Sequence, residues 1–250
     1  MGKEIYNTLL DTFENEDIKQ FAIKCIEVAP EYFWHVPASS TGKYHPQYSL
    51  GESGLARHTI ALVRILNHMF EVESVANQFT SRERDLLRVA GITHDMMKSG
   101  TQEDYEKSKY TKFDHPILAA KMVWGIPGEI SDVEKTRICR CIMSHMGAWN
   151  CDKRYPNIIL PKPEDKYQII LHLCDYLASR KDIEILFDDQ KSEHQPPKPS
   201  EPADINTWRL PFGKFKGLTL LEVKKQAPWY IKWAKENATS EPLKTLAQQL

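Results

Sequence analysis

Four histidines and two aspartates have side chains that suit metal ions, and they lie within or near the ends of the expected helices. They are His58, His94 with Asp95, His115, His145 and Asp175. Side chains from separate helices can converge in the core of a bundle, where many metal sites are built. Imidazole and carboxylate groups together suit divalent iron, manganese, zinc or nickel. The sequence therefore predicts a metal site inside a helical bundle.

Asp95 is the natural centre of this predicted site. A carboxylate can bridge two cations, which an imidazole cannot readily do, and six ligands are more than one zinc ion usually needs. His94 and Asp95 also lie between the apolar runs LLRVAGIT and MM, where two polar groups are costly to bury without a metal or a charge partner. His172, three residues before Asp175, could support the site, but we favour a structural role.

Helical signals dominate the elements that must position these residues. Apolar spacing, capping boxes and stop signals predict helices over residues 55–70, 80–97, 115–124, 131–145 and 164–180. Two of the capping boxes are Thr80 to Glu83 and Ser131 to Glu134. The fold class predicted for this part of the chain is therefore an all-α bundle.

Length, charge and composition exclude several classes of protein. The 250 residues include 33 basic and 34 acidic side chains, so the chain is not a generally basic protein that coats nucleic acid. No apolar run approaches the roughly 20 residues that span a bilayer, and the first residues do not form a signal peptide. The five cysteines contain no CxxC pair, which argues against a disulfide scaffold or thiolate zinc site. We expect a cytoplasmic protein without membrane contact.

A polar, proline-rich segment over residues 188–206 predicts a linker between a domain at 1–187 and a small module at 207–250. The module has 8 Lys or Arg and 3 Glu, a net charge of +5, which leaves −6 for residues 1–206. WRLPFGKFKGL predicts two short strands around Gly213 and Lys214, and a helix capped at Thr219 follows. The module is therefore predicted to be a small α+β appendage.

The order H, HD, H, H, D resembles the HD-domain superfamily of metal-dependent phosphohydrolases. The motifs that carry the resemblance are GESGLARHT, GITHDMMKSG, DHPILAAKMV and CIMSHMGAW. The similar region covers about Tyr32 to Arg180 and is most similar to the HD domains of bacterial 3′-5′ exoribonucleases, which carry an OB-fold domain ahead of the HD domain. No such domain fits before Tyr32 here, so a nucleic-acid groove would have to come from elsewhere. Ser53 and Arg57 also stand where those relatives tend to have glycine and an acidic residue.

The resemblance implies two divalent metal ions, with Mn2+ or Fe2+ first and Zn2+, Ni2+, Co2+ or Mg2+ also open. It implies that His58, His94, Asp95 and Asp175 hold one ion and that Asp95, His115 and His145 hold the other. Lys98 lies three residues after Asp95, on the same face of the expected helix. We therefore take Asp95 and Lys98 as catalytic, with Lys98 contacting a phosphate oxygen; a lysine that only interacts with the helix dipole is the alternative.

Four residues are candidates for substrate binding. The related exonucleases carry a similar Tyr-His pair, which points to Lys43 and His45 in the loop before the first histidine, although an ordinary polar loop is an equal alternative. The loop is not a P-loop, because GxxxxGK[ST] is absent. Arg57, beside His58, and Arg180 are further candidates for contact with phosphate.

The C-terminal module has a resemblance of its own. LPFGKFKGLTLLEV followed by APWYIKWAKEN is similar to the small C-terminal module of exodeoxyribonuclease X and of related phage and bacterial proteins. A basic hairpin with exposed aromatic rings could stack on bases while its lysines meet phosphates. Alternatively, Trp208, Trp229 and Trp233 form the core of an accessory module that docks a protein partner. A viral origin, with the host cytoplasm as location, stays open.

Three classes of function remain. The favoured class is a metal-dependent phosphohydrolase or phosphodiesterase that acts on single-stranded nucleic acid, as a 3′-5′ exonuclease, or on nucleotides such as deoxynucleoside triphosphates. The second is a mixed-valence di-iron oxygenase, because some HD proteins use the same six ligands in this way; it would require iron and O2. The third is a noncatalytic adaptor, which would bind nucleic acid in the presence of a chelator and turn over nothing.

Overall fold

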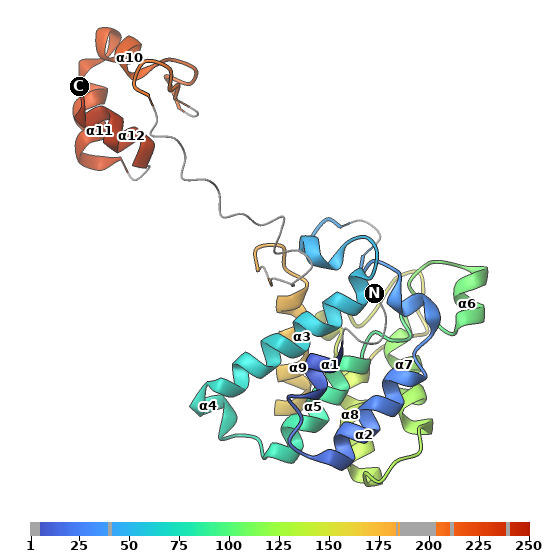
Figure 1. Cartoon of the computed structure of the whole chain (residues 1–250). Coiled ribbons are helices and arrows are strands. Elements are labelled where there is room, and N and C mark those ends of the chain that lie inside the picture. Colours follow the sequence, from blue (N-terminus) through green and yellow to red (C-terminus); the bar gives the residue numbers. More distant parts are fainter. Residues whose placement is uncertain (1–5, 40–41, 184, 186–203, 211–212, 239–240) are drawn as a thin grey trace. The chain divides into compact units, whose positions relative to one another are not determined.

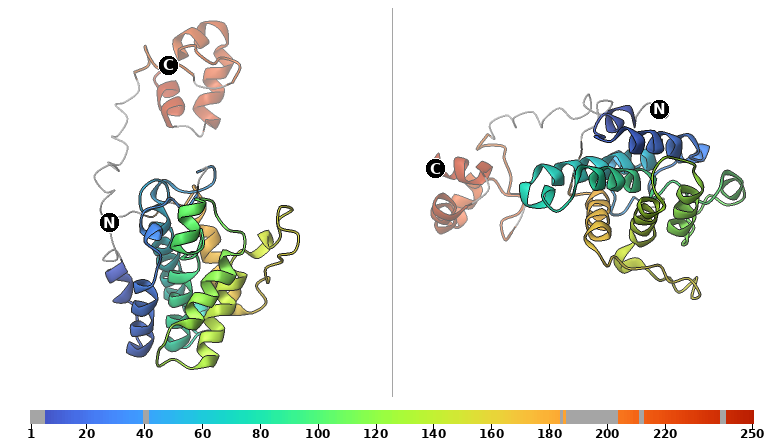
Figure 2. Two further views of the ribbon diagram at one scale, coloured as in Figure 1. Left: turned by 90° about the vertical axis from the view of Figure 1, so that its right-hand side faces the viewer. Right: turned by 90° about the horizontal axis from the view of Figure 1, so that it is seen from below.

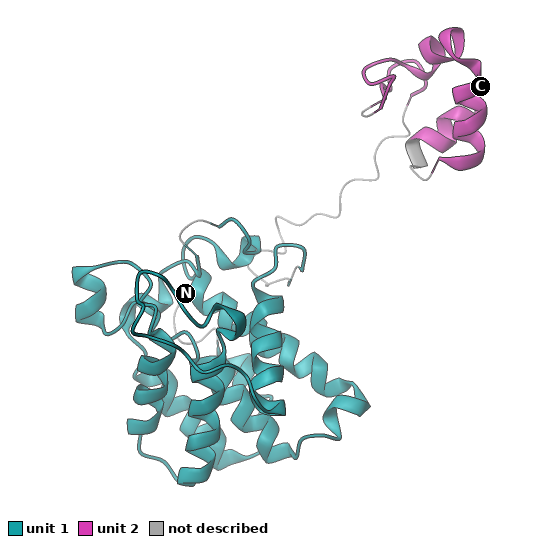
Figure 3. Ribbon diagram, turned by 180° about the vertical axis from the view of Figure 1, so that it is seen from behind, with its two compact units in different colours: residues 1–187 teal, residues 188–250 magenta. Residues whose placement is uncertain are grey.

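A computed structural model describes residues 6–39, 42–183, 185, 204–210, 213–238 and 241–250. Two compact units divide the chain, residues 1–187 and 188–250 (Figure 3). Most of the predicted linker, residues 188–203, lies outside the described residues.

The first unit is a helical bundle (Figure 1). Its α-helices are α1 (Asn7–Leu10), α2 (Glu16–Glu27), α3 (Gly54–Glu71), α4 (Glu73–Ala76), α5 (Ser81–Thr93), α6 (Gln102–Lys107), α7 (His115–Gly125), α8 (Asp132–Ser144) and α9 (Lys166–Ala178). Helix α5 packs against α2, α3, α8 and α9, and α7 packs against α8. The described residues of this unit form no strand, only an isolated bridge between Cys151 and Ile159. The all-α prediction is confirmed.

Short 3-10 turns connect these helices at η2 (Glu31–Trp34), η3 (Gln47–Ser49) and η4 (Gly147–Trp149). The segment between α8 and α9 projects from the bundle in both views of Figure 2, where it is yellow. Helix α3, the longest at 18 residues, is buried from Gly54 to Val63 because its apolar residues face neighbours on several sides. No helix in the described part of the chain is long and apolar enough to cross a membrane.

The helix starts agree with the sequence signals. Both predicted capping boxes are formed, at the starts of α5 and α8, and a third box caps α9 through Asp165 and Gln168. Each box satisfies backbone N–H groups that have no partner inside the helix. The starts of α5, α8 and α9 are therefore set by local sequence.

The end of α5 differs from the prediction. The helix ends at Thr93 rather than near Met97, and tight three-residue turns follow through Ser99. The Tyr32 hydroxyl holds the far end of these turns, because it accepts a hydrogen bond from the backbone N–H of Ser99 at 3.0 Å and donates one to the carbonyl of Gly100 at 2.8 Å. These bonds stabilise a turn conformation that differs from that of a continuing α-helix. The predicted shared helix face for Asp95 and Lys98 is therefore wrong.

The second unit has a hydrophobic core of its own. Its helices are α10 (Leu220–Gln226), α11 (Pro228–Asn237) and α12 (Glu241–Gln248). The predicted cap at Thr219 is formed. The hairpin expected around Gly213 is reduced to one antiparallel bridge, Arg209 with Thr219, beside backbone hydrogen bonds between Leu210 and Leu218. Gly213 and Gly217 both have positive φ, so the chain turns twice within a few residues and no strand is formed in the described part.

Candidate metal centre

The six predicted residues converge in the first unit, although they come from five segments. His58 lies in α3, His94 and Asp95 follow α5, His115 begins α7, His145 follows α8, and Asp175 lies in α9. Their ligand atoms form three overlapping sets in which all atoms lie within 4.8 Å of one another: His58, His94 and Asp95; His94, His145 and Asp175; and Asp95, His115 and His145. Five of the six side chains are buried, and that of Asp175 is 17% exposed. Each set has the residue types and spacing to hold a metal ion.

Asp95 lies between two pairs of histidines, and each of its carboxylate oxygens faces one pair. Oδ1 is 3.0 Å from Nε2 of His115 and 3.7 Å from Nε2 of His145. Oδ2 is 3.6 Å from Nε2 of His94 and 4.0 Å from Nε2 of His58. The carboxylate could therefore supply one oxygen to each side of the cluster.

Backbone carbonyl groups fix the orientation of three of the imidazole rings. Nδ1 of His94, His115 and His145 lies 2.8, 2.7 and 2.7 Å, respectively, from the carbonyl oxygen three residues earlier. Because a carbonyl oxygen only accepts, each Nδ1 carries the proton and donates it. A neutral ring then has its lone pair on Nε2, the atom that faces the cluster.

Two of these Nε2 atoms face each other. Nε2 of His115 and Nε2 of His145 are 3.3 Å apart, and neutral rings would set two lone pairs against each other. Within the described residues, Nε2 of His94 and Oδ1 of Asp95 are also buried without a hydrogen bond. Acceptors that are buried together without donors are costly unless a cation lies among them. The donor set therefore fits divalent metal ions.

The charges of the cluster also suit cations. Burial raises the pKa of Asp95, but Lys98 and the neighbouring histidines outweigh it, so the pKa lies well below 3.8. Burial likewise raises the pKa of Asp175, but the neighbouring His58 and His94 outweigh it, so that this pKa also lies well below 3.8. Burial lowers the pKa of His145 to about 3. The cluster thus presents two ionised carboxylates and a neutral ring at ordinary pH.

Two basic residues contact the cluster from outside. Nζ of Lys98 lies 2.6 Å from Oδ2 of Asp95, because the turns after α5 bring these residues together. His172 donates from Nδ1 to the backbone carbonyl of His145 at 2.7 Å and so fixes the turn that carries this ring. A Cβ atom at Gly147 would lie 2.1 Å from the His172 ring, which keeps this position glycine. The structural role favoured for His172 includes support of the site; its spacing from Asp175 was the only signal.

One cavity adjoins the cluster, and a second is lined in part by Lys98. The first, which we call the aromatic cavity, has a volume of about 200 Å3 and is lined by His145 and Asp175 together with Trp149, Tyr176 and Arg180. The second, the lysine cavity, has a volume of about 220 Å3, and its lining includes Lys98, Tyr105, Lys109 and Tyr110. The aromatic cavity is lined by residues of the cluster itself, whereas the lysine cavity is connected to the cluster through Lys98.

The four candidate substrate-binding residues separate into two groups. His45 and Arg180 both line the aromatic cavity, and burial beside His58 lowers the pKa of His45 to about 4. Lys43 is exposed, with its ammonium 5.0 Å from the ring of the next residue, a tyrosine. Arg57 is buried and donates to two backbone carbonyls of the loop before α3, at 2.6 and 2.7 Å. Neither Lys43 nor Arg57 lines a cavity beside the cluster.

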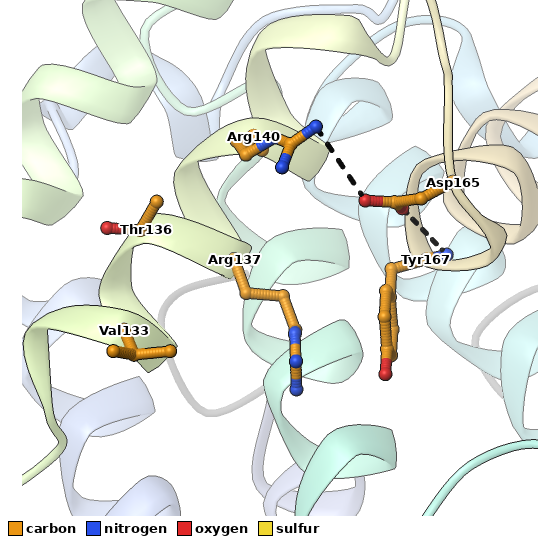
Figure 4. A pocket seen from close by; sticks show the side chains of 6 residues that line it. All are labelled: Val133, Thr136, Arg137, Arg140, Asp165 and Tyr167. Carbon is orange, nitrogen blue, oxygen red and sulfur yellow. Dashed lines mark hydrogen bonds and ion pairs between the residues drawn. The ribbon is translucent and has the colours of Figure 1, made fainter.

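A further cavity of about 270 Å3 lies along α8 (Figure 4). It contains two arginines, but both are paired with carboxylates. Arg140 lies 3.9 Å from Asp165, and Arg137 lies 3.1 Å from Glu83. None of the metal-binding sets in the described residues includes a residue of this cavity. We therefore do not assign the chemistry to it.

The tryptophans of the second unit differ in their environment. Trp208 is partly buried against the core of the unit, whereas Trp229 and Trp233 on α11 are 61% and 43% exposed. The alternative in which all three form the core therefore holds only for Trp208. Two large aromatic side chains remain on the surface of a basic module.

Comparison with known proteins confirms both resemblances. Residues 57–180 match the HD domain, and residues 210–239 match the exodeoxyribonuclease X-like C-terminal domain. No curated protein and no solved structure matches the chain. The matched HD region contains all six residues of the cluster. HD domains are in general metal-dependent hydrolases, and the cluster supplies side chains able to hold the metal.

Proposed function

We propose that this protein is a metal-dependent phosphohydrolase that cleaves a phosphoester bond in a nucleic acid or a nucleotide. The observation that carries the proposal is the buried cluster itself, in which the Nε2 atoms of His115 and His145 face each other and Asp95 lies between two pairs of histidines. His58, His94, Asp95 and Asp175 would hold one ion; Asp95, His115 and His145 would hold the second. Mn2+ and Fe2+ are the first choices for this set of oxygen and nitrogen donors.

Divalent ions at this position lower the pKa of water and neutralise charge on phosphate oxygens. The chain's own residues supply the remaining functions. The bonds from Nδ1 to backbone carbonyls hold the rings in place before the ions bind, which reduces the cost of ordering the site. Lys98, whose side chain is 18% exposed, lies in the lysine cavity beside Asp95 and can contact a nonbridging phosphate oxygen.

We propose a single-stranded nucleic acid as the substrate, degraded from its 3′ end, with the second unit as the strand holder. Support comes from the match to a domain of an exodeoxyribonuclease and from the exposed rings of Trp229 and Trp233. Lys225 and Lys232 are exposed on the same small unit and can meet phosphates. The net charge of +5 over residues 207–250 favours a negatively charged partner, such as a nucleic acid, over a neutral or basic one.

The test is hydrolysis by the full chain, purified without oxygen and loaded with Mn2+. The substrates are 5′-labelled single-stranded RNA and DNA and a panel of nucleotides, with His94→Ala as the inactive control. A ladder that shortens from the 3′ end and is absent in the variant supports the nuclease. Cleavage of nucleotides alone supports a nucleotide hydrolase.

Two other outcomes would overturn the proposal. Activity that requires iron and O2, with none in Mn2+ under argon, would identify a di-iron oxygenase. Absence of turnover with every metal, together with nucleic-acid binding that EDTA does not change, would identify an adaptor.

A further inference from the structure

We infer that the aromatic cavity binds the base of a nucleotide against Trp149 and Tyr176 and that Arg180 binds a phosphate group of the same substrate. The cavity shares His145 and Asp175 with the candidate metal centre, so the inference rests on the proposed phosphohydrolase function. It narrows that function to substrates that carry an aromatic base.

The first reason is the flat apolar surface beside the cluster. The rings of Trp149 and Tyr176 are stacked, with their centroids 6.0 Å apart and an angle of 13° between their planes. Trp149 is 54% exposed and Tyr176 is 37% exposed. Tyr176 is also the residue after Asp175, so this surface begins next to the candidate metal centre. Every nucleobase has a π-face that stacks on such rings, whereas a sugar phosphate offers none.

The second reason is a cation without a carboxylate partner. The guanidinium of Arg180 lies 4.4 Å from the ring centre of Tyr176 and 5.8 Å from that of Tyr44. Its Nε is buried without a hydrogen bond, and among the described residues no carboxylate forms an ion pair with it. Arg137 and Arg140 in the cavity of Figure 4 have such partners. A guanidinium at a cavity that has no carboxylate partner and an Nε–H without an acceptor suits a phosphate or another oxyanion.

The third reason is size. The cavity of about 200 Å3 is smaller than the roughly 300–1,000 Å3 of pockets for drug-sized ligands. It has room for one base and part of its sugar, and it is too small for a duplex. The position beside the cluster therefore fits the terminal nucleotide of a strand or a free nucleotide.

The experiment compares substrates that differ only in the base. One pair is a single-stranded oligonucleotide with either a normal or an abasic 3′-terminal residue, and the other is a nucleoside 5′-monophosphate against ribose 5-phosphate. For the full chain with Mn2+, we expect kcat/KM to be roughly tenfold or more higher when the base is present, the size of one stacking contact. Trp149→Ala and Tyr176→Ala should remove this preference, so that kcat/KM becomes similar for base-bearing and abasic substrates. Arg180→Ala should lower kcat/KM for all four substrates.

Two controls separate recognition from folding. Trp124→Ala removes a tryptophan of similar exposure, 49%, at the far end of α7 from His115, and it should keep the preference. Trp149→Phe retains an aromatic face and should keep most of the preference for substrates with a base. Calorimetry in EDTA measures binding of a nucleoside monophosphate without turnover. In this measurement Trp149→Ala should bind the nucleotide more weakly than the unmodified chain.

The outcomes distinguish the inference from the function on which it rests. Equal cleavage of base-bearing and abasic substrates by the unmodified chain would overturn the base site and leave the phosphohydrolase intact. An equal loss on both kinds of substrate in Trp149→Ala, with a lower melting temperature, would also overturn it, because the ring would then be structural. Absence of cleavage of every phosphoester would overturn the proposed function instead.

Discussion

Asp95 is the residue on which the candidate metal centre depends most. Its two oxygens face different pairs of histidines, so its removal takes a ligand from both halves of the site. We predict that Asp95→Ala loses both ions by elemental analysis while the helical circular dichroism persists. Activity should fall by more than the roughly 10- to 100-fold typical of losing a supporting partner. Asp152→Ala removes a carboxylate outside the cluster that pairs with Arg154, and it should change neither the metal content nor the activity. Full metal retention in Asp95→Ala would refute the shared role.

Ser53 is a second residue with a testable cost. It has φ 58°, in the left-handed region, directly before α3, and its buried hydroxyl has no hydrogen-bond partner in the described part. A residue other than glycine costs about 1 kcal/mol or more there. Ser53→Gly relieves the backbone strain and removes the unpaired hydroxyl. Together these two gains in stability outweigh the loss that comes from the greater entropy of the unfolded chain.

We expect Ser53→Gly to raise the midpoint of thermal unfolding by about 2–4 °C, which corresponds to about 1 kcal/mol. Ser53→Ala is the matched variant, because it removes the hydroxyl and keeps the strained backbone, so its gain should be smaller. A Gly variant that is less stable than the Ala variant would show that strain at this position is not the dominant cost.

At the residue scale, the sequence identified residues whose type is chemically distinctive and missed residues whose role depends on the three-dimensional fold. His94 and Asp95 could be identified because polar groups among apolar residues are costly without a partner, and the other four residues of the cluster followed from the order of histidines and aspartates along the expected helices. Arg57 could not be judged in this way, because its hydrogen bonds to loop carbonyls depend on how the loop folds. Trp149 and Tyr176 carried no signal, since an exposed ring is ordinary until it is seen to adjoin the cluster.

At the scale of elements, Arg82 at the start of α5 ties three helices together. It pairs with Asp17 in α2 at 2.6 Å and with Glu134 in α8. The hydrogen bond from Arg82 is the largest cause that lowers the pKa of each carboxyl, below 3.8 for Asp17 and below 4.5 for Glu134. Because both pKa values are lower in the folded state, the stabilisation is complete above the unfolded values and is lost as pH falls through the folded ones.

We therefore predict that the free energy of unfolding decreases between about pH 5 and pH 3 in the unmodified chain and decreases less in Arg82→Ala. At pH 7 the variant should be less stable by about 1 kcal/mol, a small value because all three side chains are partly exposed. Urea unfolding over this pH range provides the measurement, with Arg82→Lys as an intermediate. If the free energy of unfolding falls equally with pH in the unmodified chain and in Arg82→Ala, other groups cause the acid sensitivity.

The start of α5 was predictable, whereas its end was not. A capping box is written in four consecutive residues, so the starts of α5 and α8 followed from the sequence. The turns that follow α5 are held instead by the hydroxyl of Tyr32, which lies more than 60 residues earlier in the chain. Tertiary contacts of this kind override local propensity, and they also determine where Lys98 meets Asp95.

At the scale of the whole molecule, the basic module is the part whose role is most open to a binding experiment. Its core excludes Trp229 and Trp233, which lie four residues apart and so on one face of α11. Stacking is worth about 1–3 kcal/mol per base. Each phosphate neutralised on a single strand adds about 0.7 to the slope of the logarithm of affinity against the logarithm of salt concentration. Aromatic and basic contributions can thus be measured separately.

We predict that Trp229→Ala with Trp233→Ala, in the full chain, weakens binding of a single-stranded oligonucleotide by tenfold or more and leaves the salt slope unchanged. Lys225→Ala with Lys232→Ala should instead reduce the slope by about 1.4, one increment for each lysine. Fluorescence anisotropy in EDTA, over a series of salt concentrations, measures both without hydrolysis, with Trp124→Ala in the first unit as control. If neither pair changes affinity or slope, the exposed face of α11 does not hold the strand, and a protein partner becomes the better explanation for its tryptophans.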